Sequence, residues 1–212
     1  MRTDDLIATL SAELAPTPPG VFWRRVAIGT AGGTLAAALL WLGSMGPRAD
    51  LAEAVVAWPF WMKFFYTLTI AVTGLWLLSR AGRPGATLMP PVLTLLVPIA
   101  AMIALAGLAL MEPDADTHRL LMGHTGLWCP FAIALVSLPI LAGSFWSLKK
   151  LAPTRLTLAG GAAGLFAGSS GAFVYAFYCT ESAAPFVAIW YSLGTGLSSI
   201  VGALLGKTAL RW

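Results

Sequence analysis

Two residue types in this chain could carry out chemistry, cysteine and histidine. The 212 residues include two cysteines, Cys129 and Cys179, and two histidines, His118 and His124. Thiols can pair as a disulfide, react with oxidants or, together with imidazole, bind soft metal ions. The cysteines are therefore a candidate redox or metal sensor, and His124 is a weaker candidate metal ligand. A purely structural disulfide and two buried, unlinked thiols remain alternatives.

The composition determines where these side chains must lie. Hydrophobic residues make up 58% of the chain and charged residues only 10%, whereas soluble domains carry about 25% charged residues. The mean hydropathy is +0.81. Apolar runs long enough to cross a bilayer, about 20 residues each, predict an all-α polytopic protein with six transmembrane helices. The predicted spans are residues 26–43, 60–79, 91–111, 128–147, 156–178 and 186–206.

Charge alternates between successive connections and sets the topology. By the positive-inside rule, the basic connections lie in the cytoplasm, so both termini are cytoplasmic. The basic set is Arg24, Arg25, Arg80, Arg83, Lys149, Lys150, Arg155, Lys207 and Arg211. The opposite set is mostly acidic, with Asp50, Glu53, Glu112, Asp114, Asp116 and Glu181, and with Arg48, Arg119 and Lys63 as minority cations. The expected location is the inner membrane of a bacterium.

This topology places both cysteines at the outer, periplasmic end. Cys129 begins the fourth span and Cys179 ends the fifth, and these two helices should be adjacent and antiparallel. The expected mismatch in height is on the order of 5 Å, and a disulfide needs Cα atoms within about 7 Å. A disulfide between them is allowed but not required.

Small residues recur every four positions in the last two spans, which places each set on one helix face. Such faces favour tight packing of the two spans or, alternatively, a homodimer interface. The sets are Gly160, Gly164, Gly168 and Ala172 in the fifth span, and Gly194, Ser198, Gly202 and Gly206 in the sixth.

Residues 1–20 are predicted to form a short cytoplasmic amphipathic helix and a proline-rich linker, ahead of a transmembrane domain at 21–212. A helix of about a dozen residues needs a surface to fold against. Its acidic polar face does not suit a membrane surface, so we expect it to bind a groove on a partner protein, with the chain's own inner loops as the alternative. The residues expected to bind are Asp4, Asp5, Leu6, Ile7, Leu10 and Leu14.

The sequence lacks the motifs of the common enzyme classes. It contains no phosphate-binding glycine loop, no zinc-protease motif, no nucleophile elbow and no Cys-x-x-Cys pair. We therefore expect no enzymatic activity, no resident cofactor beyond a transient heavy-metal ion, and no direct contact with nucleic acid. A small transporter or channel for a soft metal or an uncharged solute is the alternative function, and a structural membrane subunit is a third.

Several motifs together resemble one family. They are the N-terminal Asp4-Asp5-Leu6-Ile7 run, the stretch from Cys179 through Pro185-Phe186-Val187 to Trp190-Tyr191, and the closing Gly202-Ala203-Leu204-Leu205-Gly206 and Leu210-Arg211-Trp212. Over essentially its whole length, the chain resembles NrsF-type membrane anti-sigma factors. The family often has His-Cys-Pro-Glu where this chain has Tyr178-Cys179-Thr180-Glu181, so a histidine beside the second thiol is missing.

The resemblance implies a function. It implies that the N-terminus sequesters an extracytoplasmic-function sigma factor at the membrane, and that the sigma factor is released under oxidative or heavy-metal stress. Cys129 and Cys179 match the family's cysteine pair and would be the sensing residues.

Overall fold

A computed structural model describes residues 3–12, 20–44, 46–83, 85–113, 115–149, 151 and 153–211. These residues form an all-helical structure that includes six helices long and apolar enough to cross a membrane, as the sequence predicted. The six spans are α2 (Val21–Ser44), α4 (Trp58–Ala81), α5 (Met89–Leu110), α7 (Cys129–Lys149), α8 (Leu156–Tyr175) and the α9–α10 segment (Ala184–Ala209).

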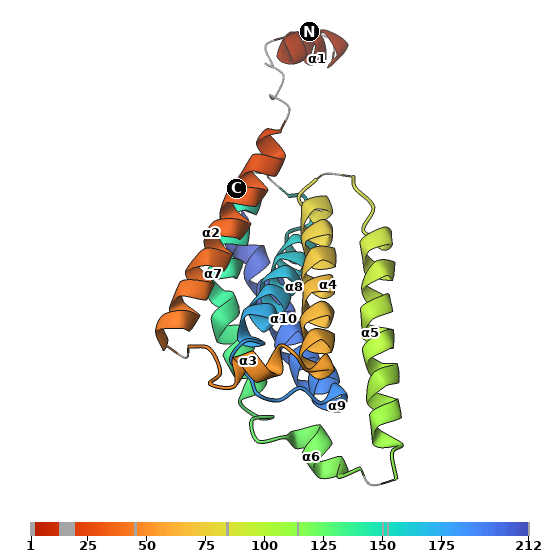
Figure 1. Ribbon diagram of the computed structural model, residues 1–212. Helices are drawn as coiled ribbons and strands as arrows, with labels where there is room; N and C mark the ends of the chain where they lie inside the picture. Colours follow the sequence, from red (N-terminus) through yellow and green to blue (C-terminus); the bar gives the residue numbers. More distant parts are fainter. Residues whose placement is uncertain are drawn as a thin grey trace.

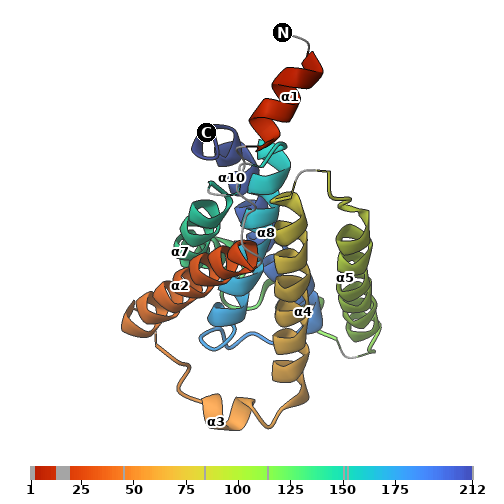
Figure 2. The same ribbon diagram turned by 90° about the horizontal axis from the view of Figure 1, so that it is seen from above.

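Helix α8 is the centre of the bundle. It contacts α10, α4 and α7, and 72% of its apolar stretch is buried, against 11% for α5. Glycine, alanine and serine dominate its sequence, which lets three neighbouring helices approach its axis closely. Helix α5 stands at the edge beside α4 (Figures 1 and 2), where its exposed leucines and valines suit contact with lipid.

The two small-residue faces pack against each other within one chain. A Cβ atom added to Gly160 would overlap the carbonyl oxygen of Gly202, and one added to Gly164 would overlap that of Ser198. These contacts bring α8 and α10 together along most of their length. The faces are therefore occupied intramolecularly, and a homodimer would have to use another surface.

A second close approach, between α2 and α7, was not predicted. Gly29 and Gly33 of α2 lie against the backbone of α7 at Gly143 and Pro139. The hydroxyl of Ser147 also donates to the carbonyl oxygen of Arg25 at 3.0 Å. The spacing of Gly29 and Gly33 is the same four-residue signal that was recognised in the last two spans.

Several helix ends differ from the predicted spans. Helix α2 begins at Val21, five residues before the predicted start at residue 26. The fifth span was expected to reach residue 178, but α8 ends at Tyr175 and a turn continues to Cys179, whose N–H donates to the carbonyl oxygen of Tyr175 at 3.0 Å. The sixth span begins with α9 (Ala184–Phe186), continues as π-helix η1 (Val187–Tyr191) and ends with α10 (Ser192–Ala209). Pro185 suits the first turn of a helix, where its missing N–H costs nothing.

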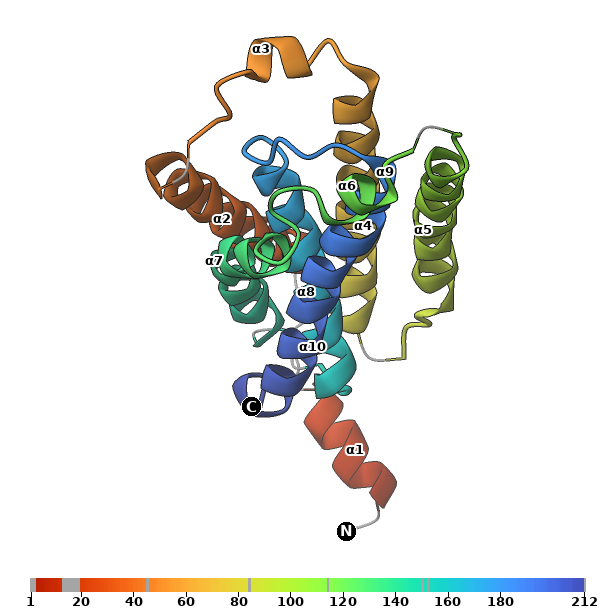
Figure 3. The same cartoon turned by 90° about the horizontal axis from the view of Figure 1, so that it is seen from below.

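The bundle has two distinct ends. Both termini lie at one of them, with α1 (Thr3–Ala12) beyond it (Figure 1). The short helices α3 (Leu51–Ala54), α6 (Thr117–Met122) and α9 lie at the other (Figure 3). We call these the terminal end and the thiol end, because Cys129 and Cys179 lie at the second.

Candidate functional site

Cys129 and Cys179 meet at the thiol end. Cys129 is the first residue of α7 and Cys179 follows α8, and only 0% and 3% of their surfaces are exposed. Both are unlinked thiols, and they lie within hydrogen-bonding reach of each other. The structure thus brings together the two residues that the sequence singled out, in the reduced form.

An apolar cluster encloses the pair. The cysteines lie in a single cluster with buried side chains of α4, α5, α7, α8 and the last span, and Ile133, Phe186 and Val187 are completely buried. These side chains are buried, so nearby charges act on the sulfur atoms with less screening than they would in water.

A buried lysine of α4 completes the site. Lys63 is 0% exposed. Among the described residues, its side chain is the one charged side chain that is buried. Its Nζ donates to the carbonyl oxygens of Cys179 and Glu181, both at 2.8 Å. The sequence identifies Lys63 only as a minority cation near the outer end of a span. A lone lysine inside an otherwise uncharged span, residues 60–79, was the signal that could have placed it in the site.

Glu181 ties two connections together over the cysteines. Its Oε1 accepts the backbone N–H of His124 at 2.8 Å, and its carbonyl oxygen lies 3.9 Å from the Sγ of Cys179. The segment between α6 and α7 is thus held against the segment that follows α8. His124 contributes its backbone here, and the residue is exposed.

The predicted metal ligands do not form a full coordination shell. Within the described ranges, no three histidine, cysteine, aspartate or glutamate side chains gather as metal ligands. What the structure offers a soft metal ion is the thiol pair itself.

Arg48 borders a cavity of about 380 Å³ that Cys179 also lines. Its guanidinium forms an ion pair with Asp50 and lies 3.4 Å from the carbonyl oxygen of Cys179. The hydrogen bond from Arg48 lowers the pKa of Asp50 to about 2, and the same bond raises the pKa of Arg48. The rim of this cavity is therefore charged at any physiological pH.

The π-helix η1 brings Tyr191 to the site. A π-helix is rare and is frequently found at functional sites. Here it places the hydroxyl of Tyr191 beside the Cys179 thiol, and within the described part of the chain this hydroxyl has no nitrogen or oxygen partner. The neighbouring Trp190 donates its Nε1–H to the carbonyl oxygen of Leu121 at 2.7 Å, which holds the last turn of α6 against η1. Sequence reasoning used this stretch only as part of a family motif.

The terminal end holds the predicted binding helix. In α1, Asp4, Asp5 and Ile7 are exposed, and Ile7 shows 59% of its surface. Leu6 and Leu10 belong to the helix, but their side chains lie outside the described part, and Leu14 lies outside the described residues altogether. Helix α1 therefore presents an exposed surface at the end opposite the thiols (Figure 1).

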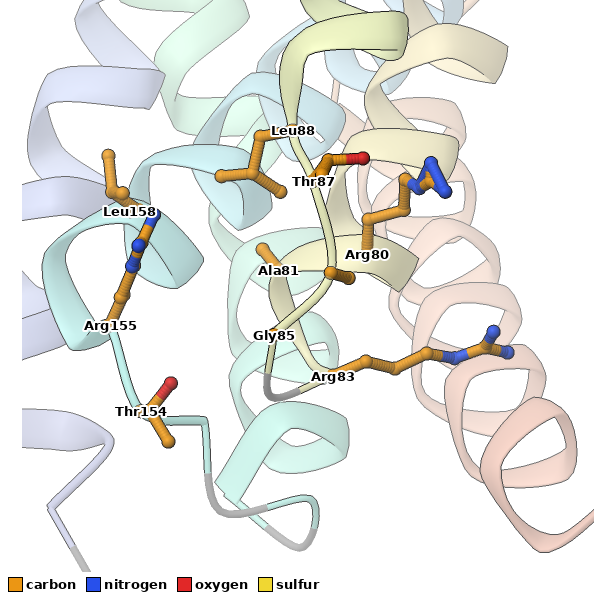
Figure 4. A pocket seen from close by; sticks show the side chains of 10 residues that line it. Arg80, Ala81, Arg83, Gly85, Thr87, Leu88, Thr154, Arg155 and Leu158 are labelled. Carbon is orange, nitrogen blue, oxygen red and sulfur yellow. The ribbon is translucent and has the colours of Figure 1, made fainter.

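Arginines line a cavity of about 300 Å³ at the terminal end. Figure 4 shows that the guanidinium groups of Arg80, Arg83 and Arg155 do not converge on one point. Arg83 instead lies over the rings of Phe22 and Trp23, 4.2 and 5.2 Å from their centroids. The end of α4 thus contacts the start of α2, directly after the segment that connects α2 to α1.

Comparison with known proteins identifies the family. The family model NrsF, described as negative regulator of sigma F, matches residues 10–212. The chain belongs to the NrsF family. It is 38% identical over 213 residues to the probable anti-sigma-F factor NrsF of Azospira oryzae, and 38% identical over 219 residues to the anti-sigma-F factor NrsF of Caulobacter vibrioides. Both alignments cover 100% of each chain, and no solved structure matches significantly.

Membership in the NrsF family confirms the resemblance drawn from the motifs. The NrsF relatives carry names of regulators of a sigma factor, so regulation of transcription is the activity associated with the family.

Proposed function

We propose that this protein is an inner-membrane anti-sigma factor that senses stress through Cys129 and Cys179. Its cytoplasmic N-terminus holds an extracytoplasmic-function sigma factor, and reaction of the two thiols with an oxidant or a heavy-metal ion releases it. The observation that carries the proposal is the contact of two buried thiols at one end of the bundle while α1 is exposed at the other.

The thiol pair suits both kinds of signal. Hydrogen peroxide would oxidise one thiolate to a sulfenic acid with loss of hydroxide, and the second thiol would then displace water to form a disulfide. A soft metal ion would instead replace the two thiol protons. Either product differs from the reduced pair in the distance and geometry of the two sulfur atoms, so it changes the packing of α7 against the segment after α8.

The energies are of the right order for a partial or complete switch. A disulfide contributes about 2–4 kcal/mol, and changing a regulator from 99% bound to 1% bound takes about 5.5 kcal/mol. Changed packing among the spans has to supply the difference.

Both α8 and α4 run between the two ends, and we propose that they carry the change. Arg83, which directly follows the end of α4, contacts Phe22 and Trp23 of α2. If an Arg83→Met variant responds to peroxide or a heavy-metal salt like the wild type, the route through α4 is excluded.

The proposed topology places both termini in the cytoplasm and the thiol end in the periplasm. It is supported by the basic residues at the terminal end and the shared position of both termini (Figure 1). A periplasmic reporter such as alkaline phosphatase should be active when fused after residue 113 and inactive when fused after residue 211. The reverse result would invert the topology.

The experiment that tests sensing replaces Cys129 and Cys179 by serine, singly and together. Transcription from a promoter that depends on the sigma factor is measured with and without peroxide or a heavy-metal salt. We expect the double variant to lose the induced increase while the amount of protein in the membrane stays unchanged. Serine at Ala132, a half-buried position of α7 near Cys129, is the control and should leave induction intact. Full induction in the double variant would refute sensing by these thiols.

A further inference from the structure

The complete burial of the Lys63 side chain calls for a structural or functional explanation. An ammonium group in apolar surroundings is costly unless hydrogen bonds and a counter-charge compensate it, and ionisable residues inside a membrane span usually serve a function. Apart from Lys63, residues 58–79 of α4 are uncharged, and the lysine is completely enclosed.

The lysine binds the backbone on both sides of Thr180. Two of its three N–H groups donate to the carbonyl oxygens of Cys179 and Glu181 at 2.8 Å. The Sγ of Cys179 lies 3.9 Å from the same carbonyl oxygen of Glu181. The ammonium and the sulfur thus share a neighbour, and the ring of Tyr191 covers the ammonium at 5.8 Å.

We infer that Lys63 is a positioning residue for the thiol pair. Lys63 fixes the backbone around Cys179 and favours the Cys179 thiolate, so that Cys179 reacts before Cys129. This inference rests on the proposed sensing function and assigns different roles to the two cysteines. Cys179 is the nucleophile, and Cys129 is the resolving thiol.

The surroundings of Cys179 are asymmetric in the same sense. The Cys129 thiol lies within hydrogen-bonding reach of the Cys179 sulfur, and the Lys63 ammonium binds the carbonyl oxygen of Cys179 itself and none of Cys129's described groups. Cys179 also lines the cavity beside Arg48, which provides a path from the surface for a reagent and for the departing proton. The ionisable groups that face Cys179 are Lys63 of α4, Cys129 of α7, Tyr175 of α8, Tyr191 of η1, and Arg48, Glu181 and Tyr178 of the connections.

Alkylation of the thiols by iodoacetamide measures this asymmetry. The thiol first loses its proton to water. The thiolate then attacks the methylene carbon, so that a sulfur–carbon bond forms and iodide leaves with the electron pair of the carbon–iodine bond. Because only the thiolate reacts, the rate below the pKa falls about tenfold for each unit by which the pKa rises.

The experiment uses the full-length protein in membranes. Iodoacetamide is added at pH values from 5.5 to 9.5, and mass spectrometry of peptides separates the adducts of Cys129 and Cys179. In the wild type, Cys179 should be modified first. In Lys63→Met, which keeps the length of the side chain but removes its charge, modification of Cys179 at pH 7 should slow about tenfold and the midpoint of the rate–pH profile should rise.

Two further variants separate charge from packing. Lys63→Arg keeps the charge and should keep a midpoint close to that of the wild type. Arg119→Met removes an exposed cation of α6 at the same end of the bundle and should change nothing. If Lys63 only stabilises the fold, Lys63→Met will unfold at lower temperature while the midpoint for Cys179 remains that of the wild type, and this result would overturn the inference.

The order of reaction in the wild type needs no variant. Modification of Cys129 before Cys179 would overturn the inference even if Lys63→Met failed to fold. The proposed function fails on a different measurement, which is unchanged induction of transcription in the double serine variant. A lysine-dependent Cys179 in a protein whose cysteines do not control transcription would uphold the inference about reactivity and refute the sensing function.

Discussion

The two ends of this bundle are built in opposite ways. At the thiol end, Lys63, Arg48 and Glu181 bind backbone groups that lie more than fifty residues away in the sequence, and the reactive sulfur atoms are enclosed. At the terminal end, α1 is a short local helix whose described side chains are exposed. The thiol end is completed by its own chain. The terminal end presents a surface that we expect a partner to cover.

The two ends therefore suit the two parts of the proposed function, reaction of the thiols and binding of a partner. Enclosure holds the cysteines in place, so we expect a small chemical change at the thiols to alter packing. An isolated helix of ten residues is marginal in water, so we expect α1 to gain stability if a partner binds it. Changes at the thiol end should therefore affect folding and response together, and changes in α1 should affect binding alone.

The largest expected effect breaks this comparison at α1. Changing Leu6 and Ile7 to Asp together places two charges on the apolar face of the helix, so we expect binding of the sigma factor to weaken at least 100-fold, or about 3 kcal/mol. The temperature of unfolding should not change. Co-purification of the sigma factor measures the first quantity, and Thr9→Asp, on another face of the same helix, is the matched control. Retained binding in the double variant would show that α1 is not the binding element.

An intermediate effect is expected at Glu181. Glu181→Ala leaves the N–H of His124 without its carboxylate partner, so we expect the free energy of unfolding to fall by about 1–2 kcal/mol. Hydrogen exchange of the segment 123–128 should accelerate. Glu181→Gln keeps an oxygen acceptor and should fall between this variant and the wild type. Faster exchange in α1 but not in this segment would contradict the role of Glu181 as a local tie.

The smallest effect is expected at Asp50. The Arg48 partner lowers the pKa of this exposed carboxyl to about 2, so the stability that the pair contributes is present above the ordinary carboxyl pKa and is lost only as pH falls through about 2. Acidification from pH 7 to pH 4 should therefore leave the pair intact. Asp50→Asn should leave the unfolding temperature of the protein nearly unchanged, because exposed ion pairs contribute little. A large shift in this temperature would show that the cavity rim is part of the core.

Much of the fold could be predicted because bilayer thickness imposes a simple rule on sequence. Six apolar runs gave six helices, and glycines four residues apart identified the contact between α8 and α10. The same rule placed the two cysteines at one end of the bundle. It failed at the ends of helices, where the turn after Tyr175 and π-helix η1 depend on contacts with other segments.

The sequence by itself determined the class of the protein, the order of its spans, the presence of a short N-terminal helix and the shared end of the two thiols, because hydropathy, charge and helical periodicity are local properties. Only the tertiary structure decided that Lys63 and Tyr191 join the thiols and that Glu181 holds His124. These contacts join positions on four different segments, and no local pattern records which buried polar groups will satisfy one another once the helices have packed.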